Sequence, residues 1–165
     1  EVTNNVPVHK GDVFFIESGT LHAIGKGILI AEIQQNSNTT YRVYDYGRVG
    51  KDGKPRELHI EKAIDVTELC PPKYDTKPQG KPVKIDGGEE TLLRSCEYFD
   101  VHKIKVSGTV TLDADEKSFM SVLVLDGSGK IGELDAKKGD SFFVPAGYGR
   151  FTLTGNLEVI LSDIV

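Results

Sequence analysis

The chain has 165 residues, of which 38% are hydrophobic, and it carries a net charge of −5. Acidic and basic residues are interspersed without a basic block, which excludes a nucleic-acid-binding footprint, and the longest apolar run is too short to span a bilayer. The two cysteines, Cys70 and Cys96, lack metal-ligand spacing and favour a reducing, cytoplasmic setting, although a disulfide between them stays open. The sequence begins at Glu1 and enters a strand pattern at once, so we interpret it as a fragment.

Strand signals dominate the first third of the chain. Apolar or alternating runs at residues 13–16, 27–33 and 39–46 are separated by glycine-containing turns, as in an antiparallel sandwich or barrel. An Asp-Gly pair at residues 52–53 predicts a hairpin. Residues 55–66 then give the one helical pattern, with Pro55 near its start. These three or four strands have no obvious partner sheet, which predicts an incomplete barrel.

A proline-rich stretch, "CPPKYDTKPQGKP" at residues 70–82, predicts an extended connector. Strand signals resume after it, and "SVLVLDGSGKIGEL" is predicted to be a hairpin that turns at residues 126–129. The strands expected in this part are residues 97–106, 109–112, 119–126, 129–133, 140–144, 150–154 and 158–162.

The predicted fold class is all-β, a cupin-like jelly-roll sandwich with one short helix. Residues 1–69 are expected to form the second part of an incomplete barrel, residues 70–92 a linker, and residues 93–165 a small C-terminal barrel.

One segment of the sequence occurs in two similar copies. "KGDVFFIESGTLH" at residues 10–22 aligns with "KGDSFFVPAGYGR" at residues 138–150, with identical Lys, Gly, Asp, Phe, Phe and Gly at six of the thirteen positions. The first copy ends on His22 and the second on Arg150. An imidazole can ligate a metal, whereas a guanidinium has no lone pair to give, so the second barrel is expected to be metal-free.

The Gly-Asp turn, buried strand, glycine turn and following histidine resemble the second motif of cupins. The text that follows, "GTLHAIGKGILIAEIQQNSNTTYRVYDYGR" and then "DGKPRELHIEKA", resembles the type I mannose-6-phosphate isomerases, in particular the short bacterial form. This specific resemblance runs from about residue 11 to residue 63. From about residue 93 the chain looks like the small C-terminal barrel of the same enzymes, with weaker motifs.

The resemblance implies a zinc-dependent conversion of mannose 6-phosphate to fructose 6-phosphate through an enediol. It implies His22 as one zinc ligand, while the family's Gln, second His and Glu ligands have no counterpart in this sequence. A catalytic zinc takes about three protein ligands. The chain alone is therefore expected to bind zinc weakly or not at all and to lack isomerase activity.

Two further residues are candidates for catalysis. Arg42 matches the family's active-site arginine and suits an enediolate or a phosphate, although it could instead be a strand-edge arginine paired with Asp45. Glu32 is predicted by strand alternation to share a face with Ile30 and Gln34, where a partly buried carboxylate could act as the base. It could equally be a structural carboxylate between strands.

The other polar residues have simpler interpretations. We expect Gln34, Asn36 and Tyr41 to be structural, and Arg48 and Lys54 to be loop cations that could hold a phosphate. His59 is expected to be packed or at the surface, and His9 and His102 fall outside the repeat and receive no role.

Two other functions stay open at this point. A non-catalytic cupin could bind a sugar phosphate without chemistry, and a metal-dependent oxygenase could use two His and a carboxylate. The oxygenase needs a His-x-His pair that the sequence lacks.

Overall fold

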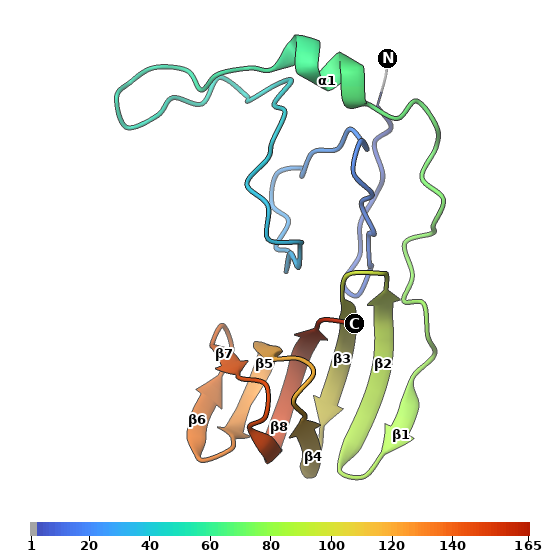
Figure 1. The fold of residues 1–165 in the computed structure, drawn as a ribbon, viewed down its shortest axis with the longest axis vertical. Coiled ribbons are helices and arrows are strands. Elements are labelled where there is room, and N and C mark those ends of the chain that lie inside the picture. Colours follow the sequence, from blue (N-terminus) through green and yellow to red (C-terminus); the bar gives the residue numbers. More distant parts are fainter. Residues whose placement is uncertain (1–2) are drawn as a thin grey trace. The chain divides into compact units, whose positions relative to one another are not determined.

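The computed structural model describes residues 3–165, which form two compact units. The first unit comprises residues 3–10 and 14–75, and the second comprises residues 11–13 and 76–165. Nearly all regular structure is β-strand and lies in the second unit, with one helix in the first (Figure 1). The predicted all-β class with one short helix is confirmed.

The helix α1 spans Ile60–Val66 and is shorter than the predicted residues 55–66. The residues before it are extended, because the backbone N–H of His59 donates to the Arg42 carbonyl at 2.7 Å and so pairs with a neighbouring segment. The helix begins without a side-chain cap on its first turn. At its end, the Thr67 hydroxyl donates to the Ala63 carbonyl at 2.6 Å and satisfies one of the last carbonyl groups.

The strands predicted at residues 13–16, 27–33 and 39–46 do not form. The physical reason is that a strand needs a ladder of hydrogen bonds with a neighbour. In the described residues these three segments belong to no such ladder, and single backbone hydrogen bonds, such as that from His59 N–H to the Arg42 carbonyl, do not form one. Their apolar side chains stay exposed, most of all Leu29, whose exposed fraction is 90%. The apolar or alternating pattern of these three segments is typical of strands, but residues 3–165 contain no sheet that includes them.

The predicted Asp-Gly hairpin does form. Val49 and Pro55 make an antiparallel bridge, and Gly50 N–H donates to the Lys54 carbonyl at 2.7 Å. Gly53 adopts a φ of 74° in this turn, a left-handed conformation that a residue with a Cβ adopts at a steric cost. The hairpin prediction is confirmed because its signal is local.

The second unit consists of eight strands. They are β1 (Val83–Ile85), β2 (Gly88–Ser95), β3 (Asp100–Val106), β4 (Thr109–Ala114), β5 (Met120–Ile131), β6 (Leu134–Lys137), β7 (Ser141–Val144) and β8 (Gly149–Asp163). β1 and the first part of β2 lie within residues 70–92, so the sheet begins earlier than the predicted linker allowed. The proline-rich stretch ends at Pro82, and the Asp86-Gly87 turn then joins β1 to the antiparallel β2.

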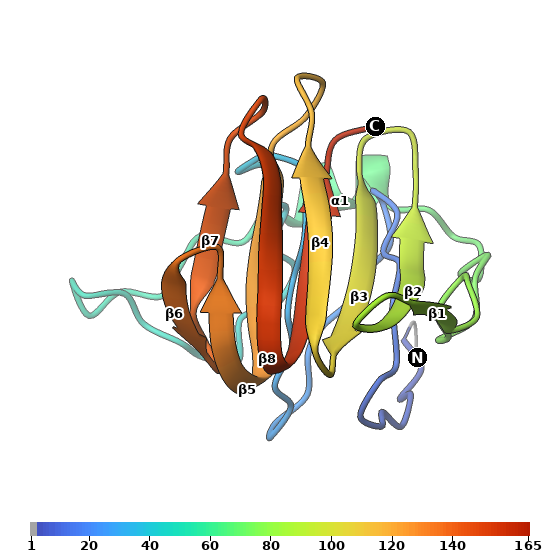
Figure 2. The same cartoon turned by 90° about the horizontal axis from the view of Figure 1, so that it is seen from below.

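Two long strands, β5 and β8, organise this unit. β8 pairs with β4 through residues 149–154 and with β3 through residues 157–163. β5 pairs with β8 along almost its whole length, and β6 and β7 border its two ends. Figure 2 shows β4 beside β8, with β5 and β6 following on from β8. Each long strand therefore pairs with several neighbours, and Gly155, with a φ of 109°, lies between the part of β8 that pairs with β4 and the part that pairs with β3.

The predicted hairpin turn at residues 126–129 is wrong, because β5 runs through it to Ile131. The glycines serve a close approach of two backbones instead. A Cβ on Gly129 would lie 1.9 Å from the Thr154 carbonyl oxygen, and one on Gly127 would lie 2.0 Å from that of Asn156. No side chain fits at either place.

Side chains from the strands of this unit meet in one hydrophobic core. Its largest fully buried members come from four strands, β3, β4, β5 and β8: Ile104, Val106, Val110, Val122, Val124, Leu153 and Val159. Within residues 3–165 no helix has the length and apolar character that crossing a bilayer requires.

Substituting Gly129→Ala is expected to destabilise the second unit by about 3 kcal/mol, because a backbone carbonyl cannot rotate away from the new methyl group. Urea unfolding followed by circular dichroism measures the loss. Gly108→Ala is the matched control, since its Cβ would make an ordinary 3.7 Å contact with Gly87. Equal stability of the two variants would contradict the close-approach explanation.

Candidate functional site

His22 lies in the first unit, just after a chain reversal at Gly19. Gly19 has a φ of 86°, and a Cβ there would lie 2.8 Å from the Val66 carbonyl oxygen, so this reversal requires glycine as predicted. Its own carbonyl accepts a 2.9 Å hydrogen bond from the Glu68 N–H, which ties the turn to the end of α1. The position of His22 is thus set by backbone geometry.

The His22 ring has a defined hydrogen bond. Its Nδ1 lies 2.8 Å from the Thr20 carbonyl oxygen, and a carbonyl can only accept, so Nδ1 carries the proton. In the neutral imidazole Nε2 then keeps its lone pair, and the ring is exposed. Metal-ligating histidines commonly donate one ring N–H to a carbonyl in this way and bind through the other nitrogen. The arrangement suits a metal ligand.

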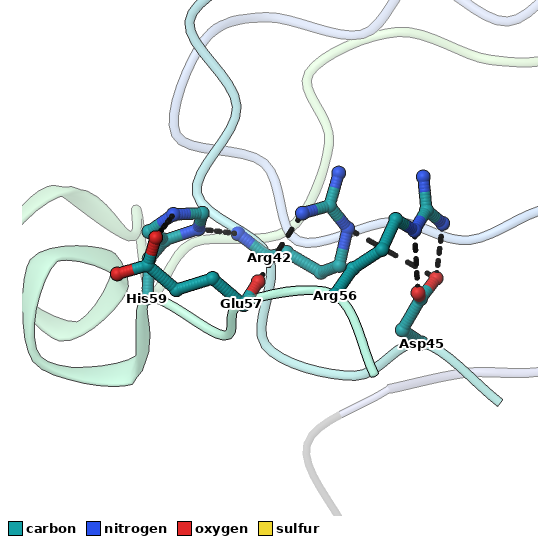
Figure 3. Close-up of polar contacts among 5 residues, drawn as sticks. All are labelled: Arg42, Asp45, Arg56, Glu57 and His59. Carbon is teal, nitrogen blue, oxygen red and sulfur yellow. Dashed lines mark hydrogen bonds and ion pairs between the residues drawn. The ribbon is translucent and has the colours of Figure 1, made fainter. Parts of the chain in front are cut away.

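Arg42 is held against the segment that leads into α1 (Figure 3). Its backbone N–H donates to His59 Nδ1 at 3.1 Å, and its carbonyl accepts from the His59 N–H. Its guanidinium donates through one terminal nitrogen, Nη1, to the Glu57 carbonyl oxygen at 3.2 Å, and Nε lies 3.9 Å from Asp45 Oδ1. The other terminal nitrogen, Nη2, has no acceptor among residues 3–165 and can donate to an anion.

Asp45 has Arg56 as its main partner, a contact that the sequence analysis missed. Arg56 Nε donates to Asp45 Oδ2 at 2.6 Å, and a second guanidinium nitrogen contacts Oδ1 (Figure 3). This hydrogen-bonded pair lowers the pKa of Asp45, and the nearby charges of Arg42 and Arg48 lower it further. Asp45 is therefore ionised at neutral pH and anchors two arginines. The Asp-Gly hairpin was the signal that could have placed them together.

Glu32 is exposed. Within the described part of the chain, neither Glu32 nor His22 makes a hydrogen bond or ion pair with Arg42. The shallow hollow beside His59, lined by residues 57–62, measures about 190 Å³, which is below the roughly 300 Å³ of typical ligand sites. The structure brings together Arg42, Asp45, Arg56 and His59 and leaves the other two candidates separate.

A second polar group lies in the other unit. Asp100, His102 and Asp163 each place a potential ligand atom within 4.8 Å of the others, a set that could hold a metal ion. Sequence reasoning gave His102 no role, because the register that sets Asp163 opposite Asp100 cannot be obtained without the fold.

Comparison with known proteins identifies the relatives of this chain. The family model for the cupin domain of mannose-6-phosphate isomerase matches residues 88–164. The mannose-6-phosphate isomerase ManA of Bacillus subtilis (strain 168) is 43% identical over 99% of the chain and 52% of its own length. The mannose-6-phosphate isomerase of Streptococcus mutans is 40% identical over 95% of the chain and 50% of its own length. The chain thus spans about half the length of these curated relatives.

A solved structure agrees with the sequence matches. The crystal structure of the mannose 6-phosphate isomerase from Bacillus subtilis superposes with a TM-score of 0.65 and 36% identity, covering 78% of this chain and 41% of that one. The cupin class predicted from the sequence is therefore confirmed.

Proposed function

We propose that this chain, which is similar to the mannose-6-phosphate isomerases and matches their cupin domain at residues 88–164, supplies the C-terminal half of such an enzyme. The full-length protein would interconvert mannose 6-phosphate and fructose 6-phosphate, an aldose–ketose isomerisation. The observation that carries the proposal is the 43% identity to one such isomerase across 99% of the chain.

His22 is the residue of this chain that would hold zinc. Its exposed ring, with Nδ1 bonded to the Thr20 carbonyl and Nε2 available, fits that role. A catalytic zinc takes about three protein ligands, so the remaining ligands belong to the half of the barrel outside this sequence. A zinc ion held by His22 and those ligands would supply Lewis-acid polarisation of the substrate's carbonyl group.

Arg42 would stabilise negative charge on the substrate. Asp45 and the Glu57 carbonyl hold its guanidinium on one side, which leaves Nη2 for an enediolate oxygen or a phosphate. The paired Asp45 and Arg56 keep this arrangement charged at neutral pH. Arg42 therefore acts through positioned charge and transfers no proton.

Glu32 is the proposed base that moves the proton between carbons 1 and 2. It is exposed in the isolated chain, and the strands that would complete the barrel mouth around it lie outside this sequence. The two free cysteines fit a reducing compartment, and a cytoplasmic location is part of this proposal.

An isomerase assay on mannose 6-phosphate tests the proposal. The full-length gene product is expected to be active, to lose activity with a chelator and to regain it with zinc, while the 165-residue chain alone is expected to be inactive. Activity that resists chelation would overturn the zinc mechanism. Tight binding of mannose 6-phosphate without turnover by the full-length protein would replace the enzyme with a sugar-phosphate-binding cupin.

A further inference from the structure

Three polar side chains face the interior at one end of the second unit. Asp100 and Asp163 are directly opposite each other in the β3–β8 pair, and His102 follows two residues along β3. Side chains two apart on a strand share a face. Ile104, the next residue on this face, has an exposed fraction of 0%. Asp100, His102 and Asp163 therefore continue the core-facing row to the open end of the sandwich.

These side chains bury atoms that have no hydrogen-bond partner. Asp100 Oδ1, His102 Nδ1 and Asp163 Oδ1 are all shielded from solvent and unpaired within residues 3–165. Glu90 Oε1 lies 2.9 Å from His102 Nδ1, but outside the direction of a hydrogen bond. Buried polar atoms in native proteins almost always have hydrogen-bond partners. Three unpartnered atoms in one place therefore indicate a ligand that binds all three.

The negative charges at this end of the second unit also favour a bound cation. Asp100 and Asp163 are directly opposite each other in the β3–β8 register, and each has a carboxylate oxygen within 4.8 Å of the other's. Two carboxylates in contact repel each other unless a proton or a metal ion lies between them. Glu90 adds a third carboxylate beside His102.

We propose that Asp100, His102 and Asp163 bind a divalent transition-metal ion of the zinc or cobalt kind. One imidazole nitrogen with two carboxylates suits these ions, whereas calcium and magnesium prefer oxygen ligands alone. His102 Nδ1, which has no hydrogen-bond partner, can bind the ion through its lone pair, and Glu90 Oε1 beside it adds a further carboxylate to the site.

This site is independent of the proposed isomerase site. It lies in the second unit and shares no residue with His22 or Arg42. The expectation of a metal-free second barrel came from Arg150, an exposed residue of β8 whose Nε lies 3.8 Å from Asp113. Of the proposed ligands, Asp163 lies at the other end of β8, and Asp100 and His102 lie on β3; the repeat includes none of them.

Titration of the chelator-treated 165-residue chain with Zn²⁺, followed by calorimetry, tests the site, and Co²⁺ provides a visible absorption spectrum. We expect one equivalent to bind. His102→Ala and Asp163→Asn are each expected to weaken binding by at least roughly 100-fold and to remove the Co²⁺ bands. Asp163→Asn nearly preserves shape, so it tests the ligand role even if His102→Ala fails to fold.

Two controls separate this site from others. Asp113→Asn removes an exposed carboxylate from the same unit, and His22→Ala removes the residue proposed for the isomerase zinc. Both are expected to leave the affinity unchanged. No metal uptake by the unsubstituted chain, or uptake that survives Asp163→Asn, would overturn the inference and would leave a proton shared by the two carboxyl groups as the explanation. Either result leaves the proposed isomerase function intact.

Discussion

Replacing His22→Ala in the full-length gene product is expected to lower kcat/KM for mannose 6-phosphate by at least roughly 1,000-fold. A Lewis-acid metal contributes several kcal/mol to stabilising the transition state, and each 1.4 kcal/mol is about a factor of ten in rate. Removing a ligand that has a defined ring orientation removes the metal with it. A coupled isomerase assay gives the rate, and elemental analysis of the dialysed protein gives the zinc content.

His9→Ala is the control, because His9 is another exposed histidine of the first unit that lies outside the repeated segment. It is expected to retain both activity and zinc. An active His22→Ala protein with a full complement of zinc would show that His22 is only a turn residue. The proposal would then lose its metal ligand in this chain.

Replacing Leu153→Ala is expected to destabilise the second unit by about 2–5 kcal/mol. Leu153 has an exposed fraction of 0% and lies on β8 opposite Val110 of β4 on one side and Ile131 of β5 on the other. Its neighbours belong to three hydrogen-bonded strands and cannot collapse into the cavity. Denaturant unfolding followed by circular dichroism measures the change.

Phe143→Ala is the matched control for that experiment. Phe143 is also an apolar residue of the second unit, but 68% of its surface is exposed. Its truncation is expected to cost less than about 1 kcal/mol, because little apolar area leaves the core. Similar losses at Leu153 and Phe143 would mean that the core lies elsewhere.

The relation between sequence and structure is clearest in the repeated segment. Gly11 and Gly139 have φ values of 96° and 91°, and Gly19 and Gly147 have 86° and 73°. Both copies thus adopt the same turns although they lie far apart in the sequence. The hairpin at residues 52–53 formed as predicted for the same reason. These turns depend on steric limits within a few residues, so the local sequence is enough to predict them.

Strand formation depended on a pairing partner elsewhere in the chain as well as on the local sequence. Residues 142–144 form part of β7 because Met120–Val122 of β5 lie beside them, whereas the similar sequence at residues 14–16 belongs to no strand ladder in the described part of the chain and forms no strand. The glycines at 127 and 129 were interpreted as a turn because their real function, the close approach of β8, involves residues far along the chain.

The amino-acid sequence by itself determined the all-β class, the local turns, and the family resemblance on which the proposed roles of His22 and Arg42 rest. Only the tertiary structure joined Asp100 and His102 to Asp163, more than sixty positions away, and supplied Arg56 as the partner of Asp45. The physical reason is that strand register is a long-range property. It follows from which faces are buried together, and no local pattern specifies that.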